Sequence, residues 1–241
     1  MKKQPLGANA DFPRAYTTVD VAIFAVAGDE LRVLLVERPR EAGEPFPGLM
    51  ALPGGFVDVE RDPDLRHCAL RKLKEKTGVA AGYLEQLGSW GSAMRDPRGW
   101  SSTHAYFALI PAAPEPRPGA NAADAKWFPV GGKGVRTKLA FDHAEILAAA
   151  IERLRNKVAY TSLPAFLLPR EFTLTELQRT YETVLGRPLE KSAFRTRVRA
   201  ARLVEPVDKF RVGPNRPAQV YRLKNPGAPV FFARPFSPRE K

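Results

Sequence analysis

The sequence has only one cysteine, Cys68, among its 241 residues. An intrachain disulfide and a cysteine-based zinc cluster are therefore excluded. No apolar run approaches the ~20 positions that a membrane-spanning helix needs, and the first ten residues lack the apolar core of a signal peptide. These absences predict a cytoplasmic protein with no membrane partner.

Acidic residues are scarce in the last third of the chain. Residues 157–241 hold 17 Lys or Arg and 7 Asp or Glu, whereas residues 1–156 hold 21 and 19. Most of the net charge of +12 is therefore concentrated in the last third. Such a concentration is typical of a nucleic-acid-binding surface, although a basic surface that serves only solubility has the same composition.

A glycine turn followed by a helical pattern occupies residues 52–79. Gly54 and Gly55 follow a proline and indicate a tight turn, and a helix is expected from about Asp64 to the glycine at position 78. This stretch resembles the Nudix box, the loop-helix-loop with which Nudix hydrolases hold magnesium over a nucleoside diphosphate. The resemblance implies a frame for binding a phosphorylated ligand.

The metal-binding face of this box is altered. Lys72, Glu75 and Lys76 fall at positions i, i+3 and i+4, on one helix face, where the resemblance implies three carboxylates. Mg²⁺ requires oxygen ligands, and ammonium groups repel it. We therefore predict no metal site and no catalytic residue, and the two lysines favour an anionic ligand directly.

The upstream glutamate of the box is out of register. Counting forward from the glycine at position 55 reaches Arg61, and counting back from Arg71 reaches a proline, because two extra residues are present. Three nearby carboxylates are left as substitutes, those of Glu60, Asp62 and Asp64.

Basic and imidazole side chains mark a second part of the ligand site. Residues 95–99 read Arg-Asp-Pro-Arg-Gly, and two guanidiniums on a short turn suit a diphosphate or ribose phosphate. The alternative is that Arg95 pairs with Asp96 or Glu85 on the surface. Asp142 and Glu145 are predicted to form a capping box at the start of the helix that contains His143. His143 itself either lines the ligand-binding cleft or has a structural role.

The basic third contains two helices and a hairpin. Thr173 and a glutamate three residues later predict a capped helix that ends at Gly186. A second helix, from residue 190 to about 202, directs Phe194 and Val198 one way and its basic side chains the other way. Strands at 207–212 and 218–223 form a basic hairpin. This order predicts a winged helix-turn-helix; the alternative is a helical cap or dimerisation module.

The succession of these motifs resembles the Nudix-related transcriptional regulators, the NrtR family. The motifs that carry the resemblance are residues 71–78, 85–87, 95–99, 172–178, 194–195, 216–218 and 221–222. The resemblance implies a bacterial repressor of NAD-biosynthesis or related genes. It also implies a Nudix-like domain that senses ADP-ribose or a similar NAD-derived nucleotide, and a homodimer that binds palindromic operator DNA.

The expected fold is α+β, with an N-terminal Nudix α/β/α sandwich on a mixed sheet and a C-terminal winged helix-turn-helix domain. We expect a flexible segment at 1–16, the ligand-binding domain at 17–156, the DNA-binding domain at 157–224 and a tail at 225–241 that packs on a neighbour. No cofactor is required, and Mg²⁺ is needed only for residual hydrolysis. The alternative functions are a Mg²⁺-dependent ADP-ribose or nucleoside-diphosphate pyrophosphatase, and a protein that binds RNA or capped nucleotides.

Two sets of site residues follow. The predicted ligand-binding residues are Arg38, Gly55, Arg71, Lys72, Glu75, Arg95, Arg98 and His143. The predicted DNA-binding residues are Lys191, Ser192, Arg195, Thr196, Arg199, Lys209, Arg211 and Arg216.

Overall fold

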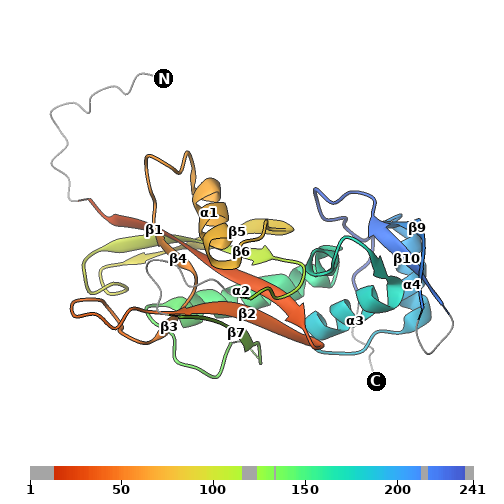
Figure 1. Cartoon of the computed structure of the whole chain (residues 1–241), viewed down its shortest axis with the longest axis horizontal. Helices are drawn as coiled ribbons and strands as arrows, with labels where there is room; N and C mark the ends of the chain where they lie inside the picture. Colours follow the sequence, from red (N-terminus) through yellow and green to blue (C-terminus); the bar gives the residue numbers. More distant parts are fainter. Residues whose placement is uncertain (1–13, 116–123, 133, 213–216, 237–241) are drawn as a thin grey trace, which may run out of the picture.

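The computed structural model describes residues 14–115, 124–132, 134–212 and 217–236. Most of the segment that was expected to be flexible therefore lies outside the described residues, as does Arg216, one of the predicted DNA-binding residues. The two domains lie next to each other along the long axis of the molecule (Figure 1). None of the helices in the described ranges is long and apolar enough to cross a membrane.

A mixed seven-stranded sheet forms the N-terminal domain. Its strands are β1 (Tyr16–Ala27), β2 (Glu30–Glu37), β3 (Met50–Ala51), β4 (Gly54–Phe56), β5 (Tyr83–Ser92), β6 (Ser101–Leu109) and β7 (Asp124–Pro129). The predicted hairpin is confirmed, because β1 and β2 pair antiparallel across a turn at Gly28 and Asp29. Strand β1 also pairs in parallel with β6, and β6 pairs antiparallel with β5, which makes the sheet mixed.

Helices α1 (Leu65–Thr77) and α2 (His143–Val158) cover opposite faces of this sheet (Figure 1). Alternate residues of β1 explain the two layers, because successive side chains of a strand point to opposite faces. Val21 and Ile23 pack in the core beside α1, whereas Ala22 and Phe24 pack in the core beside α2. The predicted α/β/α sandwich is confirmed.

Helix α1 has the ends that the sequence predicts. The Asp64 side chain accepts a hydrogen bond from the backbone N–H of His67 at 2.8 Å, and Gly78 adopts a left-handed conformation at the C-terminus. Cys68 lies in the core of this layer with no exposed surface, and burial raises the pKa of its thiol to about 12. The cysteine is therefore a packing residue and not a nucleophile.

The predicted capping box at the start of α2 is wrong. Asp142 is the N-cap residue, but its side chain makes no capping hydrogen bond. Its carboxylate instead accepts two hydrogen bonds from Arg95, and Glu145 accepts one from the indole N–H of Trp90 at 2.9 Å. Asp142 and Glu145 therefore bind partners that are distant in the sequence, and neither side chain caps the helix.

The C-terminal domain is a winged helix, as predicted. It contains a 3-10 helix η1 (Leu163–Leu167), β8 (Phe172–Thr173), α3 (Leu174–Leu185), α4 (Lys191–Ala200), β9 (Val204–Arg211) and β10 (Ala218–Leu223). The capping box of Thr173 and Glu176 is present, and Gly186 ends α3. The short strand β8 pairs with β10 and completes a three-stranded sheet that the sequence pattern did not predict.

One apolar core runs through both domains. It extends from Leu154 of α2 through Phe166 of η1 to Tyr181 and Phe194 of the winged helix. The segment around η1 is therefore a buried connection and not an exposed linker. Phe232 and other aromatic residues of the tail also join this core, so the tail packs on its own chain.

Candidate ligand cleft and nucleic-acid interface

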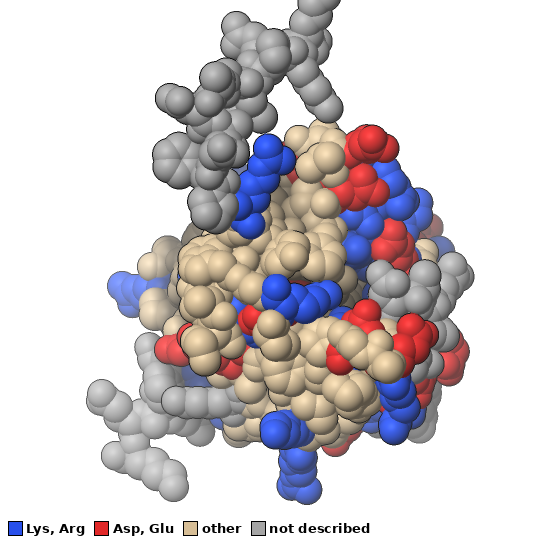
Figure 2. All heavy atoms as spheres, turned by 90° about the vertical axis from the view of Figure 1, so that its left-hand side faces the viewer, with Lys and Arg blue, Asp and Glu red and all other residues tan. Residues whose placement is uncertain are grey.

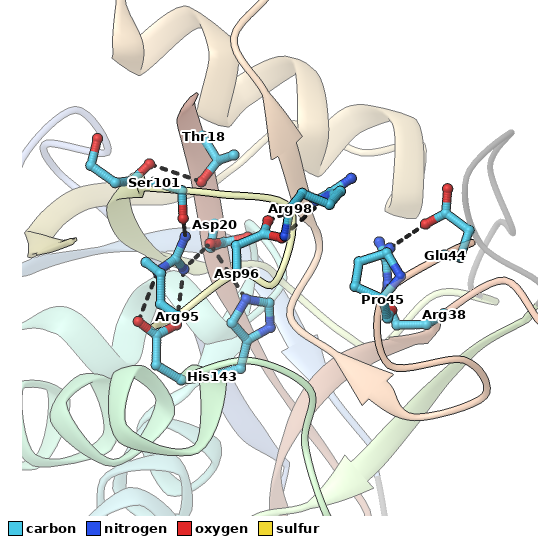
Figure 3. A network of polar contacts seen from close by, with 12 residues as sticks. Thr18, Asp20, Arg38, Glu44, Pro45, Arg95, Asp96, Arg98, Ser101 and His143 are labelled. Carbon is cyan, nitrogen blue, oxygen red and sulfur yellow. Dashed lines mark hydrogen bonds and ion pairs between the residues drawn. The ribbon is translucent and has the colours of Figure 1, made fainter. Parts of the chain in front are cut away.

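A buried cluster of charged side chains joins β1, the loop after β5 and the start of α2 (Figure 3). The Arg95 side chain is only 5 % exposed and donates two hydrogen bonds to Asp142, each of 2.9 Å. Its guanidinium also lies 3.6 Å from the Asp20 carboxylate. The alternative surface pairing of Arg95 with Asp96 or Glu85 is not observed. Arg95 instead fixes its loop to α2.

His143 connects the same cluster to the glycine turn. Its Nδ1 accepts the backbone N–H of Leu52 at 2.9 Å, so the proton of the neutral ring is on Nε2, which lies 3.5 Å from Asp20. Burial opposes ionisation of Asp20, but His143, Thr103 and Arg95 outweigh it and lower the pKa of the carboxyl. Asp20 is therefore an anion that organises the groups around it.

Two further guanidiniums extend this cluster across the end of the sheet. In Figure 3 the polar side chains run from Arg95 and His143, through Asp96 and Arg98, to Arg38. Arg98 donates to Asp96 at 2.8 Å and lies over the Phe56 ring at 5.1 Å. Burial lowers the pKa of Arg38; the Glu44 carboxylate opposes this shift, and the charge of Arg98 adds to it. An anion bound near both guanidiniums would relieve this repulsion.

This end of the molecule also exposes aromatic side chains. Figure 2 shows Lys and Arg side chains standing among wide uncharged areas there. Tyr16 and Phe56 are 46 % and 43 % exposed, and their rings meet edge to face at 5.6 Å. Neither aromatic residue was predicted for the site. In the sequence only their positions could have indicated this role: Tyr16 begins β1, and Phe56 directly follows the glycine turn.

The glycine turn is enclosed by charged side chains. A Cβ atom at Gly54 would lie 1.9 Å from Oδ1 of Asp20, and one at Gly55 would lie 3.0 Å from Nζ of Lys72. The φ angle of 140° at Gly55 is also unfavourable for any other residue. Only glycine lets the chain pass between the carboxylate and the ammonium.

The face of α1 does not suit a divalent cation. Arg71 donates to Asp62 at 2.7 and 2.5 Å and to Glu75 at 3.2 Å, so the one carboxylate on this face is already paired. Lys76 is 7 % exposed, and burial lowers its pKa. In the part of the chain that the structure describes, no three His, Cys, Asp or Glu side chains are grouped to hold a metal. These residues do not fit Mg²⁺.

The structure separates the eight predicted ligand-binding residues into three groups. Arg38, Arg95, Arg98 and His143 lie around the charged cluster, and Gly55 and Lys72 lie on the side of α1. Arg71 and Glu75 have internal partners. Of the three carboxylates that could replace the upstream glutamate, Asp62 is the one that binds Arg71, whereas Asp64 caps the helix.

The Asp62–Arg71 pair predicts a pH-dependent contribution to stability. The Asp62 side chain is 1 % exposed, and the Arg71 hydrogen bonds hold its pKa far below the ordinary value. A lowered folded-state pKa stabilises the fold above the unfolded pKa of about 4, and the effect is lost as the pH falls below it. Asp62→Asn should lower the free energy of unfolding by about 3–5 kcal/mol at pH 7.

Urea unfolding at pH 7 and pH 3 measures this difference. The difference in the free energy of unfolding between the wild type and Asp62→Asn should be smaller at pH 3 than at pH 7. The matched control is Asp64→Asn, which keeps a good N-cap residue on an exposed side chain and should change the free energy of unfolding much less than Asp62→Asn. A gap that is equal at both pH values would contradict the assignment.

A basic groove of about 760 Å³ lies between α4, the start of α3 and the wing formed by β9 and β10. The cations that line it are Arg179, Lys191, Arg195, Arg199 and Arg211. Arg179 was not predicted, although it lies three residues after Glu176, on the polar side of α3. Ser192 and Thr196 are exposed on α4. Nε of Arg195 is buried without a hydrogen-bond partner in the described structure.

Carboxylates hold the wing cations. Lys209 binds Glu171 at 3.0 Å, and Arg211 pairs with the same Glu176 that caps α3. A phosphate would have to compete with these carboxylates. We expect Glu171→Gln to raise the affinity for double-stranded DNA about two- to fivefold, the scale of an exposed ion pair.

Fluorescence anisotropy with labelled DNA at low salt checks this expectation. The control is Glu152→Gln, an exposed position on α2 that removes the same charge far from the wing. Equal effects of the two variants would show that only net charge matters.

Comparisons with known proteins agree with this architecture. A NUDIX domain model matches residues 17–150, and a model of the NrtR DNA-binding winged helix domain matches residues 164–223. The ADPR responsive transcriptional repressor NtrR of Acinetobacter baylyi is 46 % identical over 214 residues, which cover 89 % of this chain and 84 % of that protein.

Solved structures give the same result. Shewanella oneidensis NrtR complexed with a 27mer DNA has a TM-score of 0.81 and 38 % identity, with 92 % of this chain and 99 % of that chain covered. The NUDIX domain of the same protein complexed with ADP ribose has a TM-score of 0.54 and 42 % identity, with 59 % and 90 % covered.

Proposed function

The chain belongs to the NrtR family of Nudix-related regulators, and on that premise we propose that it is a DNA-binding repressor whose N-terminal domain senses ADP-ribose. Its target genes would be those of NAD metabolism or a related pathway, and it would act in the cytoplasm. The observation that carries the proposal is the single core that joins a domain with clustered guanidiniums to a winged helix with a basic groove. No catalytic step is required of this arrangement.

The cleft is suited to bind a diphosphate and to leave it intact. Arg38 and Arg98 supply guanidiniums, which bind phosphate oxygens in pairs. Lys72 places an ammonium beside Gly55, on the helix face where a Nudix hydrolase holds its metal. A sensor needs its ligand to persist, and a cleft whose charge comes from lysine and arginine satisfies that need.

The basic groove is suited to double-stranded DNA. Helix α4 would enter the major groove, where Arg195, Thr196 and Arg199 reach base edges and an arginine reads guanine through two hydrogen bonds. Lys191, Lys209 and Arg211 would bind phosphates and fix the register. A homodimer would then read a palindrome whose half-sites are about 10 bp or a multiple apart.

Helix α2 is the physical link between the two sites. Its first residues contact Arg95 and Asp20, and its last turn is held to β5 by Glu85, which binds Lys157 at 2.5 Å. Just beyond that turn, the Tyr181 hydroxyl of α3 donates to the backbone of Thr161 at 2.8 Å. A ligand that moves the start of α2 would therefore change the angle of the winged helix.

A gel-shift titration tests the proposal. The protein is mixed with double-stranded DNA from its own promoter region, and ADP-ribose is added stepwise; structured RNA serves as the competing ligand. Binding of DNA that ADP-ribose weakens is the expected result. Preference for RNA would support the third alternative, a protein of this fold that binds RNA.

The rival function is that of a Mg²⁺-dependent pyrophosphatase, which the match to the NUDIX domain favours. We expect incubation with Mg²⁺ and ADP-ribose to release at most a trace of AMP, because Lys72 and Lys76 replace two carboxylates. Robust turnover would refute our interpretation of these two lysines.

A further inference from the structure

The end of the described chain returns to the connection between the domains. The C-terminal strap, residues 230–236, lies beside residues 159–162, which follow α2, and Phe231 forms an antiparallel bridge with Thr161. Three backbone N–H groups of the strap donate to this segment: those of Val230 to Oγ of Ser162, of Phe232 to the Tyr160 carbonyl and of Phe236 to the Ala159 carbonyl, at 2.8, 2.8 and 2.7 Å. The strap is therefore fixed to the point where the chain leaves the N-terminal domain.

The last residue of the strap is inserted into the winged helix. Phe236 is 7 % exposed, and its ring packs edge to face on Tyr181 of α3 at 5.3 Å. It also stacks on Phe194 of α4 at 5.8 Å. One aromatic side chain thus touches both helices of the helix-turn-helix while its backbone holds the exit of α2.

Helix α4 also contributes a cation to this contact. The Arg197 guanidinium lies 4.2 Å from the centroid of the Phe236 ring. Its Nη1 is buried and has no hydrogen-bond partner within the described ranges. The Phe236 ring therefore stabilises the guanidinium through a cation–π contact. Arg197 belongs to a basic helix yet faces the strap and not the groove.

We propose that the C-terminal strap sets the orientation of α4 relative to α2, with Phe236 and Arg197 as its positioning residues. This inference rests on the proposed function, because an orientation that ADP-ribose can change is useful only to a DNA-binding protein. Without the strap, the core shared by α2, η1 and α3 would still join the domains, but the orientation of α4 would be less restrained.

The first test measures the orientation directly, without DNA or effector. Lys74→Cys on α1 and Ala200→Cys at the end of α4 place spin labels on exposed positions of the two domains. Cys68 can remain, because it is fully buried and its thiol stays protonated at neutral pH. Labelled protein is diluted with unlabelled wild type, so that only distances within one chain are measured by pulsed electron resonance.

Phe236→Ala should broaden the distance distribution, and Arg197→Gln should broaden it less. The matched control is Phe231→Ala, which removes a ring of the same strap that is 65 % exposed. A truncation that removes residues 230–241 should act like Phe236→Ala, and one that removes only 237–241 should act like the wild type. Circular dichroism and ADP-ribose binding by calorimetry verify that every variant is folded.

The second test measures the ADP-ribose response. In the wild type the ratio of DNA affinities without and with ADP-ribose should be of the order of 5–150, as is typical for coupled sites. In Phe236→Ala this ratio should fall towards one while ADP-ribose affinity is unchanged. Arg197→Gln, which removes the charge but keeps the strap, should lower the ratio by a smaller amount.

The outcomes distinguish a failure of the strap proposal from a failure of the proposed function. Unchanged distances in both Phe236→Ala and Arg197→Gln would overturn the role of the strap, whatever the protein binds. A broadened distribution with an unchanged ADP-ribose response would overturn it too, because the strap would then be only structural. A wild type that binds no DNA would count against the proposed function, and the distance measurement would still judge the strap.

Discussion

Arg195→Ala is expected to lower the affinity for operator DNA by about 1–3 kcal/mol, roughly 5- to 150-fold. Arg195 lies in the middle of α4 and lines the basic groove, where its guanidinium can donate two parallel hydrogen bonds. A guanine edge in the major groove would supply the acceptors. Fluorescence anisotropy at one fixed salt concentration measures the loss on operator and on unrelated DNA.

The control for this prediction is Lys191→Ala at the start of the same helix. A lysine that binds phosphate should weaken both DNA molecules equally and reduce the slope of affinity against salt by about 0.9. Arg195→Ala should instead act mainly on the operator. If it weakens both DNA molecules equally, Arg195 does not read bases and our orientation of α4 is wrong.

Arg95→Ala is expected to cost about 3–5 kcal/mol of folding free energy, because it leaves buried carboxylates without their cation. Asp20 and Asp142 are 7 % and 19 % exposed, and both lie against the Arg95 guanidinium. The start of α2 should loosen, so ADP-ribose binding should weaken as well. Urea unfolding and calorimetry measure the two effects.

The matched control is Arg38→Ala. Its partner Glu44 is more exposed, so loss of that pair should cost about 0–1 kcal/mol. If Arg38 contacts the ligand, ADP-ribose affinity should nevertheless fall. Equal losses of stability in the two variants would refute the distinction between an arginine that builds the site and one that binds the ligand.

The sequence was sufficient to predict those features that depend on residues close together in the chain. Asp64 and Gly78 mark the ends of α1, and Thr173 with Glu176 forms the capping box of α3, because each interaction spans three or four residues. The same pattern failed at Asp142. Arg95, 47 residues away, competes for that carboxylate, and no local pattern records such a competitor.

Distance along the chain also explains what the sequence did not predict. Strand β8 has two residues and exists only because β10 pairs with it. Asp62 binds Arg71 nine residues further along the chain, a separation that the fixed spacing of the box does not contain. Phe236 follows no helical or strand period, so its place between α3 and α4 was not predictable.

The measurement that tests the central claim most directly is the affinity for promoter DNA in the absence and presence of saturating ADP-ribose. The account predicts that ADP-ribose weakens DNA binding, by an amount of the order of 5–150-fold. Because coupling is reciprocal, DNA must weaken ADP-ribose binding by the same factor. A DNA affinity that ADP-ribose and related NAD-derived nucleotides leave unchanged would contradict the account.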